Sequence, residues 1–318
     1  MRAVWLREFG GPEVLVPGPA PTPRPGPGQV LIDVVHANIT FVETQFRATG
    51  FGPSLATLPV IPGNGVGGVI SAVGPDVDPG LVGRRVVTGT GGSGAYAERV
   101  VVDATTPVPV PDGLPLDQAV ALLADGRTAL MLLDAADLRP DDRVLVEAAA
   151  GGVGSLLVQL AARAGTRVVG LAGGTRKVSL LPGLGARVAV DYREPDWPDR
   201  VRAAVGAVDV VFDGVGGTVG RTAFELLEPG GRMLSFGLAS GEWAGIPEQA
   251  AAERGVTLIR PAPTPQQLRA YTERALAEAA AGRLRAVIGQ RFPLERAADA
   301  HAAISARDTV GKTLLDLG

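Results

Sequence analysis

The chain lacks cysteine altogether, and it lacks an excess of charge of either sign. Without cysteine, disulfide bonds, thiol nucleophiles and metal sites built from thiolates are excluded. The 30 Lys and Arg residues nearly balance the 33 Asp and Glu residues, and the resulting net charge of −3 argues against a nucleic-acid partner. With 46% hydrophobic and 20% charged residues, the composition is that of an ordinary globular protein.

Long hydrophobic runs are also missing. No run reaches the roughly 18 apolar residues that a membrane-spanning helix requires, and the opening sequence MRAVWLREFGGPEVL lacks the apolar core of a signal peptide. We therefore expect a cytoplasmic protein without a membrane partner. The length of 318 residues exceeds one typical core and favours two domains.

The residues that are present change their pattern along the chain. Up to about Leu116, short β-type runs such as QVLIDVVHA, GGVISAV, RRVVTGT and AERVVVD are separated by Pro and Gly clusters, which predicts a barrel-like antiparallel domain. Helices then alternate with buried strands, which predicts a parallel, doubly wound sheet. Near the C-terminus we expect helices at 265–281 and at ERAADAHAAISA. The last helix and the strand KTLLDL are expected to return to the first domain, because a terminal strand needs a sheet partner.

The segment from Val144 to Gly165, VLVEAAAGGVGSLLVQLAARAG, has the pattern of a buried strand, a glycine-rich turn and a helix. Ala149, Gly151 and Gly154 occupy the first, third and sixth positions of a dinucleotide fingerprint, with alanine in place of the usual first glycine. Gly151 allows close approach of a pyrophosphate, and the helix N-terminus favours its charge. The alternative is a glycine-rich surface turn, but the order of strand, turn and helix favours a dinucleotide site.

The next strand ends without the Asp or Glu that usually binds the ribose 2′-hydroxyl of NAD. It is followed by small and then basic residues, in the order Ala172, Gly173, Gly174, Thr175, Arg176 and Lys177. The small residues leave room for a 2′-phosphate, the threonine can donate a hydrogen bond, and the two cations supply positive charge. Tyr192 and Arg193 can add an aromatic face and another cation. A basic helix start on the surface is the alternative, and NADPH is the predicted cofactor.

Several blocks in a fixed order carry a resemblance that covers the whole chain. They are MRAVWLREFGGPEVL, LPVIPGNGVGGVISAVGPDV, GAYAERVVV, VPDGLPLDQAVAL, AAAGGVGSLLVQLAARAG, AVDYREPDW, VFDGVGG, GGRMLSFG and TVGKTLLDL. In these blocks the chain resembles the zinc-independent branch of the medium-chain dehydrogenase/reductase superfamily, close to the NADPH:quinone oxidoreductases. The resemblance implies an α/β fold with a GroES-like β-rich domain at 1–122 and 263–318, a Rossmann domain at 123–262, and a homodimer. It also implies cofactor contacts at Thr128, Gly151, Gly152, Val153, Gly154, Lys177, Tyr192, Val215, Phe236 and Gly237.

The departures from this family lie where the substrate is expected. Where relatives typically have an Asn, an Asp and often a Tyr, this chain has Thr40, Glu43 and Gln45, and Gly65 beside Asn64 replaces a usual Glu. We take Thr40, Glu43, Gln45 and Asn64 as the candidate catalytic residues. Zinc-dependent relatives use cysteine and histidine ligands, so the resemblance implies chemistry without a metal.

A zinc-free member of the family would transfer a hydride from the nicotinamide to a quinone or an α,β-unsaturated carbonyl compound. Thr40, Gln45, Asn64 and Thr128 are candidate neutral donors for the developing oxyanion. Glu43 would be a proton donor only if burial raised its pKa, and solvent would otherwise supply the proton. An apolar wall for a flat substrate can come from aromatic residues that would equally suit a core, namely Phe41, Phe46, Phe51 and Trp243.

Three functions remain open from the sequence. The leading hypothesis is an NADPH-dependent reductase of quinones or conjugated enones. The second is a biosynthetic tailoring reductase or enoyl reductase with a polyketide-like or carrier-bound substrate, suggested by Thr40, Glu43 and Gly65. The third is a catalytically silent NADPH-binding protein.

Overall fold

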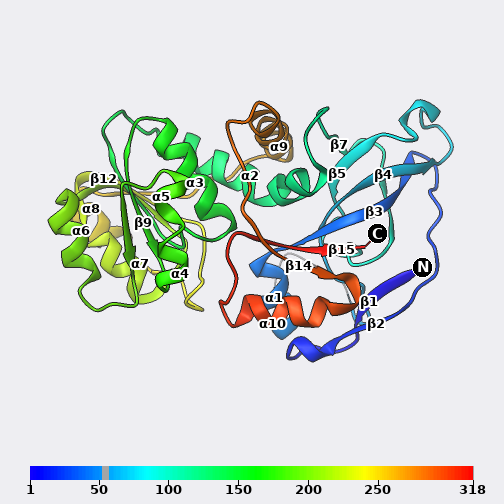
Figure 1. Cartoon of the computed structure of the whole chain (residues 1–318), viewed down its shortest axis with the longest axis horizontal. Coiled ribbons are helices and arrows are strands. Elements are labelled where there is room, and N and C mark those ends of the chain that lie inside the picture. The colour runs from blue at the N-terminus through cyan, green and yellow to red at the C-terminus, as the bar shows by residue number, and fades with distance from the viewer. Residues whose placement is uncertain (52–56, 318) are drawn as a thin grey trace. The chain divides into compact units, whose positions relative to one another are not determined.

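The computed structural model describes residues 1–51 and 57–317 and divides into two compact units (Figure 1). Unit 1 consists of Met1–Ala124 and Thr272–Gly318, and unit 2 of Asp125–Tyr271. The chain passes between them within two helices, α2 (Leu116–Ala136) and α9 (Pro265–Ala280). The predicted boundaries at 122 and 262 lie close to these positions. The observed boundaries differ from the predicted ones because each passage lies inside a continuous helix and not in a loop.

Unit 2 is built on a parallel sheet with the strand order β10-β9-β8-β11-β12-β13 in the described chain. The strands are β8 (Arg143–Val146), β9 (Arg167–Ala172), β10 (Val188–Asp191), β11 (Val208–Asp213), β12 (Leu227–Ser235) and β13 (Thr257–Ile259). The central strands are continuous apolar runs because helices cover both faces of the sheet. Accordingly, Val144, Leu145 and Val146 have no exposed surface. The chain order reverses at β8, whose carboxyl end is therefore the expected binding edge of a doubly wound sheet.

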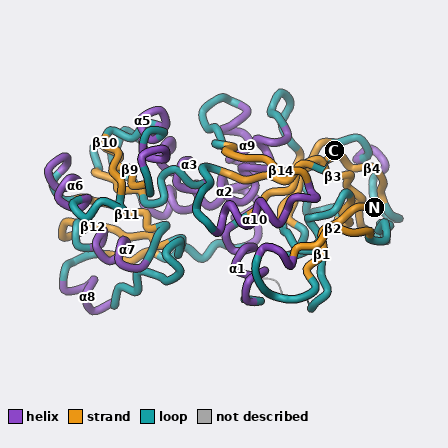
Figure 2. Tube along the Cα trace, turned by 60° about the horizontal axis from the view of Figure 1, so that its bottom comes forward, coloured by secondary structure: helices purple, strands orange, loops and turns teal. Residues whose placement is uncertain are grey.

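Helices surround this sheet in both views of unit 2 (Figures 1 and 2). They are α3 (Gly152–Arg163), α4 (Thr175–Val178), α5 (Leu181–Leu184), α6 (Trp197–Val205), α7 (Gly217–Phe224) and α8 (Glu248–Glu253). The structure confirms the predicted sequence of strand, glycine turn and helix over 144–165. The block VFDGVGG spans the end of β11 and the start of α7, and Leu227 begins β12, where it pairs with Val208.

Unit 1 is dominated by a largely antiparallel sheet. In the described residues its order is β14-β15-β3-β4-β5-β7, with β6 also paired to β3, while β1 and β2 form a separate hairpin. The strands are β1 (Arg2–Leu6), β2 (Leu15–Pro19), β3 (Gln29–Ile39), β4 (Gly65–Val73), β5 (Arg85–Gly89), β6 (Arg99–Asp103), β7 (Val108–Pro109), β14 (Ile288–Pro293) and β15 (Lys312–Asp316). The helices are α1 (Phe41–Thr49) and α10 (Ala297–Ser305), with short 3-10 turns at Pro12–Val14, Pro79–Leu81 and Leu294–Arg296.

The antiparallel pairing of β15 with β3 confirms that the C-terminal strand returns to the first domain. The α/β fold class, a β-rich domain plus a doubly wound parallel sheet, is likewise confirmed. Within the described ranges, the helices that occur lack the combination of length and apolar character needed to cross a bilayer.

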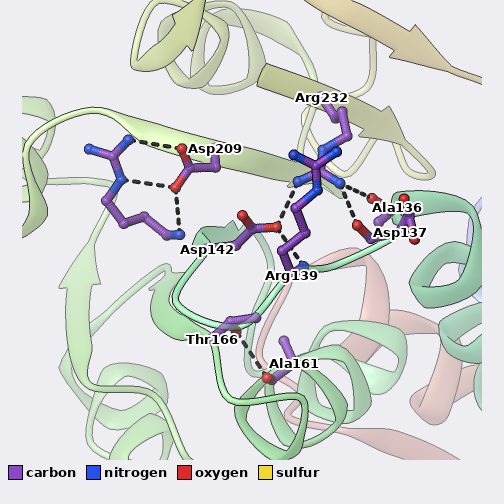
Figure 3. Close-up of polar contacts among 9 residues, drawn as sticks. Ala136, Asp137, Arg139, Asp142, Ala161, Thr166, Asp209 and Arg232 are labelled. Carbon is purple, nitrogen blue, oxygen red and sulfur yellow. Dashed lines mark hydrogen bonds and ion pairs between the residues drawn. The ribbon is translucent and has the colours of Figure 1, made fainter. Parts of the chain in front are cut away.

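A cluster of arginine–aspartate contacts stabilises unit 2 near the amino ends of β8 and β11 (Figure 3). The Arg232 guanidinium donates hydrogen bonds to the carbonyl oxygens of Ala136 and Asp137 at the end of α2, and to the Asp142 carboxylate at 2.6 Å. Arg143 holds Asp209 through its main-chain N–H and its side chain. A cation at a helix C-terminus also interacts favourably with the helix dipole. The contacts at the amino ends of the strands stabilise the unit, and the candidate site lies at the carboxyl ends of the strands.

Candidate functional site

The glycine turn follows β8 and leads directly into α3. Gly151 is the N-cap of α3, with an extended backbone (φ −83°, ψ 179°), and the first N–H groups of the helix have no intrahelical partner. A Cβ atom on Gly154 would collide with the carbonyl oxygen of Ala148, and one on Gly152 would collide with the Asp125 carboxylate of α2. At Gly151 the nearest atom to such a Cβ in the described chain is Ala148 O, at 3.1 Å. Gly154 is thus required by a contact with the main chain, and Gly152 lies against the Asp125 side chain. At Gly151 no atom of the described chain other than Ala148 O lies within 4 Å of such a Cβ, which leaves room on its other sides for a ligand.

The loop after β9 meets the residues that follow β10. Asp191 Oδ2 accepts a hydrogen bond from Gly174 N at 2.9 Å, and Arg193 pairs with the same carboxylate at 3.2 Å. Burial opposes ionisation of Asp191, but hydrogen bonds from Arg193 and Gly174 outweigh it and lower its pKa. A Cβ atom on Gly173 would lie 2.9 Å from the Tyr192 hydroxyl. The two predicted segments are therefore brought together, with Tyr192 and Arg193 against the glycine pair.

The basic residues that follow the loop after β9 lie on the short helix α4. Thr175 and Arg176 are exposed, and Lys177 is partly buried. The α4 helix begins directly after Gly174, so its cations and the Arg193 guanidinium share one end of the parallel sheet. A 2′-phosphate requires positive charge at such a position, and Arg176 and Lys177 provide it beside the Arg193–Asp191 ion pair.

The loops after β11 and β12 contact one another at the same sheet edge. Phe236 N donates to Asp213 O at 2.8 Å, and Ser240 N donates to Val215 O at 2.7 Å. Gly214 must lack a side chain, because its Cβ would lie 2.7 Å from the Phe236 ring. Since the carboxyl ends of parallel strands share one edge, this region gathers the predicted cofactor residues Ala149, Gly151, Gly152, Val153, Gly154, Gly173, Val215, Phe236 and Gly237. Thr128 lies on α2, the helix whose Asp125 contacts the start of α3.

Two buried carboxyl groups lie beneath these loops. Glu147 follows β8 directly and Asp213 ends β11, and neither has any exposed surface. Burial, reinforced by repulsion from Asp213, raises the pKa of Glu147 well above its usual range. Sequence reasoning missed this pair. The available signal was an acidic residue directly after, or at the end of, each of two neighbouring buried strands.

In unit 1 the structure brings three of the four candidate catalytic residues together. Glu43 Oε2 accepts a hydrogen bond from Thr40 N at 2.6 Å in a capping box, and Glu43 Oε1 accepts one from Asn64 N at 2.7 Å. Burial raises the pKa of Glu43, while these hydrogen bonds and Lys312 oppose the change. The Asn64 side-chain oxygen accepts from Gly92 N at 2.7 Å. Gln45 lies on α1, partly buried.

The four candidate pocket aromatics do not form one group. Phe46 is 6% exposed and packs edge-on against Phe9 within the core of unit 1. Phe51 is 82% exposed at the end of the same helical region, and Phe41 is partly buried. Trp243 is about half exposed and belongs to unit 2. Phe46 therefore serves the core and not a substrate wall.

Both histidines have internal partners. His301 of α10 is fully buried, and its Nε2 atom lies 2.9 Å from the Tyr96 hydroxyl. Burial holds the pKa of His301 to about 3 and raises the pKa of Tyr96 well above its usual range. His36 Nδ1 lies 2.7 Å from Asp316. The Tyr96–His301 pair is consequently unsuited to proton exchange with a substrate at neutral pH.

Comparison with known proteins gives a consistent result. Family models match at residues 26–112, described as alcohol dehydrogenase GroES-like domain, and at residues 184–315, described as zinc-binding dehydrogenase. The chain is 34% identical over 316 residues to a quinone oxidoreductase of Pseudomonas aeruginosa, covering 96% of this chain and 97% of the relative. It is 32% identical over 330 residues to the quinone oxidoreductase of Homo sapiens, covering 99% and 97%.

Solved structures agree with these relatives. The structure is similar to Escherichia coli quinone oxidoreductase complexed with NADPH, with a TM-score of 0.91, 28% identity and full coverage of both chains. It is also similar to a mycobacterial protein complexed with NADPH, with a TM-score of 0.89, 34% identity and full coverage of both chains.

Proposed function

Because this chain belongs to the quinone oxidoreductase family of the medium-chain dehydrogenase/reductase superfamily, we propose that it is an NADPH-dependent oxidoreductase that reduces quinones or conjugated enones. The observation that carries the proposal is the loop after β9, which has two glycines where an acid would exclude NADPH, and which lies against Tyr192 and Arg193. NADPH, when bound, supplies the hydride. The protein binds it, orients it and provides polar groups for the acceptor.

The residues of unit 2 fit this cofactor. The space at Gly151, next to the N–H groups that begin α3, suits a pyrophosphate. Arg176 and Lys177 supply the positive charge that a 2′-phosphate needs, next to Arg193, which is paired with Asp191. The loops that contain Val215, Phe236 and Gly237 lie at the same carboxyl edge of the sheet, and we assign them to the nicotinamide.

The acceptor end contributes polar groups but few acids. We assign Glu43 the task of holding the Asn64 segment to the start of α1, because both of its carboxylate oxygens accept main-chain hydrogen bonds. Thr40, Gln45 and Asn64 remain the proposed polar contacts for the substrate oxygen. Burial raises the pKa of Glu43, as a proton donor would require, but both of its oxygens already accept main-chain hydrogen bonds, and we therefore assign the proton to solvent. A hydroquinone anion tolerates this arrangement, since it does not need a proton delivered by a placed acid.

The proposed reaction uses no zinc. The chain has no cysteine, His36 is paired with Asp316, and His301 is buried against Tyr96, so the usual ligands of a catalytic zinc are missing or engaged. A homodimer and a cytoplasmic location remain predictions. A solution mass near 32.5 kDa, the mass of one chain, would reject the dimer.

An acceptor panel tests the proposed function. We expect NADPH oxidation with simple quinones and conjugated enones, at a rate that a zinc chelator leaves unchanged, because no step depends on a metal. Turnover restricted to enoyl thioesters would favour the biosynthetic reductase instead. Tight NADPH binding with no turnover on any acceptor would identify a silent binding protein and overturn the proposal.

The cofactor assignment predicts a selective effect of Lys177→Ala. Loss of a charged hydrogen-bond donor to the 2′-phosphate is expected to lower kcat/KM for NADPH by roughly 10- to 100-fold, while kcat/KM for NADH changes by less than about threefold. Arg163→Ala, which removes an exposed cation at the opposite end of α3, is the matched control. Equal losses with both cofactors would contradict the 2′-phosphate assignment.

A further inference from the structure

A buried pair of carboxyl groups joins the glycine turn to the loop that follows β11. Glu147 Oε2 accepts a hydrogen bond from Val215 N at 3.0 Å. Asp213 Oδ1 accepts one from Gly216 N at 2.7 Å, and its Oδ2 accepts one from the Ser235 hydroxyl at 2.8 Å. Through these contacts the two side chains fix the main chain of residues 214–217. That loop contains Val215 and leads into α7, which begins at Gly217.

The environment of the pair favours one proton on Glu147. The charged group that acts on Glu147 is Asp213, and the other groups that influence it are the neutral N–H groups of Val215 and Gly216. Two adjacent carboxylates without exposure to water would repel each other strongly. All three hydrogen bonds to Asp213 and to Glu147 Oε2 need an acceptor oxygen, and a proton on the other oxygen of Glu147 leaves these three acceptors in place.

The remaining oxygen of Glu147 supports the same protonation state. Glu147 Oε1 is buried and has no hydrogen-bond partner among the described residues. As an acceptor it would be an unsatisfied buried polar atom, which is costly. Asp213 is within side-chain hydrogen-bond reach of Glu147, so a proton on Glu147 can be donated to Asp213, which removes this cost.

We propose that Glu147 is protonated in the folded enzyme and acts as a positioning residue for the cofactor, by sharing its proton with Asp213 and holding residues 214–217 against the glycine turn. The effect on cofactor binding rests on the proposed NADPH function, but the protonation of Glu147 can be tested without cofactor. Glu147 does not touch the reacting atoms. It acts through the loop that carries Val215.

The pH dependence follows from the direction of the pKa change. Burial and Asp213 raise the pKa of Glu147 above its value in the unfolded chain. The contribution of this group to stability is therefore complete below the unfolded pKa, and it is lost progressively as the pH rises toward the folded pKa. Ionisation would place two carboxylates side by side and release the loop, so NADPH affinity should also fall as the pH rises.

Glu147→Gln tests the protonation state. The amide has the shape of a protonated carboxyl: its oxygen can accept from Val215 N and its NH2 group can donate to Asp213, but it cannot ionise. Without cofactor, we expect the Tm of this variant minus that of the wild type to increase by about 4 °C between pH 5 and pH 9. Glu253→Gln, at an exposed position of α8, should follow the wild type at every pH. A constant difference for Glu147→Gln across this range would overturn the proposed protonation.

Glu147→Leu tests the positioning role. Leucine cannot accept from Val215 N or donate to Asp213, so the Kd for NADPH at pH 6 is expected to rise about 10-fold, with Glu147→Gln restoring wild-type affinity. Wild-type affinity in a folded leucine variant would reject the positioning role.

If the leucine variant does not fold, the NADPH affinities of the wild type and of Glu147→Gln provide the test. The two affinities should diverge as the pH rises, and parallel curves of affinity against pH would reject the positioning role. A wild-type enzyme that binds no NADPH, with the Tm result intact, would refute the proposed function and leave the protonation standing.

Discussion

Gly151→Val is expected to raise the Kd for NADPH by about 100-fold, equivalent to about 2.7 kcal/mol of binding free energy. The extended backbone of Gly151 is one that valine adopts readily, and the nearest atom to the new Cβ in the described chain is Ala148 O at 3.1 Å, a close contact that a shift of a few tenths of an ångström relieves. The side chain would instead occupy the space at the start of α3 where the pyrophosphate is expected to bind. Fluorescence or calorimetric titration with NADPH provides the measurement.

The matched control is Gly183→Val in α5. Gly183 is exposed, and a Cβ there meets nothing within 4 Å among the described residues, so the substitution adds the same side chain to unit 2 away from the glycine turn. We expect its NADPH affinity to stay within about twofold of the wild type. If Gly151→Val binds NADPH as tightly as this control, the glycine turn is not the phosphate site.

The fingerprint could be interpreted from the sequence because its requirements are local. Gly154 must allow α3 to approach the turn, and the collision of its Cβ with Ala148 O supports that interpretation. Gly152 is different, because its constraint comes from Asp125 on α2, a residue distant in sequence. Contacts between separate elements of this kind depend on the tertiary arrangement and leave no local pattern.

The candidate site was less completely predicted in unit 1. Thr40 and Glu43 have the spacing of a capping box, which is a sequence signal for a helix start, and the structure contains that box. Sequence reasoning proposed catalytic roles for both because they occupy positions where the family has other residues. The hydrogen bond from Asn64 N to Glu43 joins two segments that only the fold brings together.

Residue type alone also could not separate core from surface among the aromatics. Phe46 and Phe51 are close in sequence, yet one is buried against Phe9 and the other is almost fully exposed. Phe46 faces the core because α1 turns that side toward it, whereas Phe51 follows the left-handed Gly50 that ends the helix. The face of α1 therefore determines the environment of Phe46, and the end of the helix determines that of Phe51.

Arg232→Ala is expected to lower the free energy of unfolding by about 3 kcal/mol. The Arg232 and Asp142 side chains are only 15% and 12% exposed, so their ion pair is shielded from water (Figure 3). Removing the guanidinium would leave the Asp142 carboxylate without its charged partner and deprive the carbonyl oxygens of Ala136 and Asp137 of a donor. Urea unfolding monitored by circular dichroism provides the measurement.

The control for this loss is an ion pair of the same chemistry in water. Arg260 and Glu248 are 2.7 Å apart, but their side chains are 71% and 69% exposed, so Arg260→Ala should cost less than about 1 kcal/mol. The contrast follows from burial, because a partner left behind at the surface is solvated, whereas Asp142 is not. Equal destabilisation by the two substitutions would mean that Arg232 contributes no more than a surface cation, and that the end of α2 is held to β12 by other contacts.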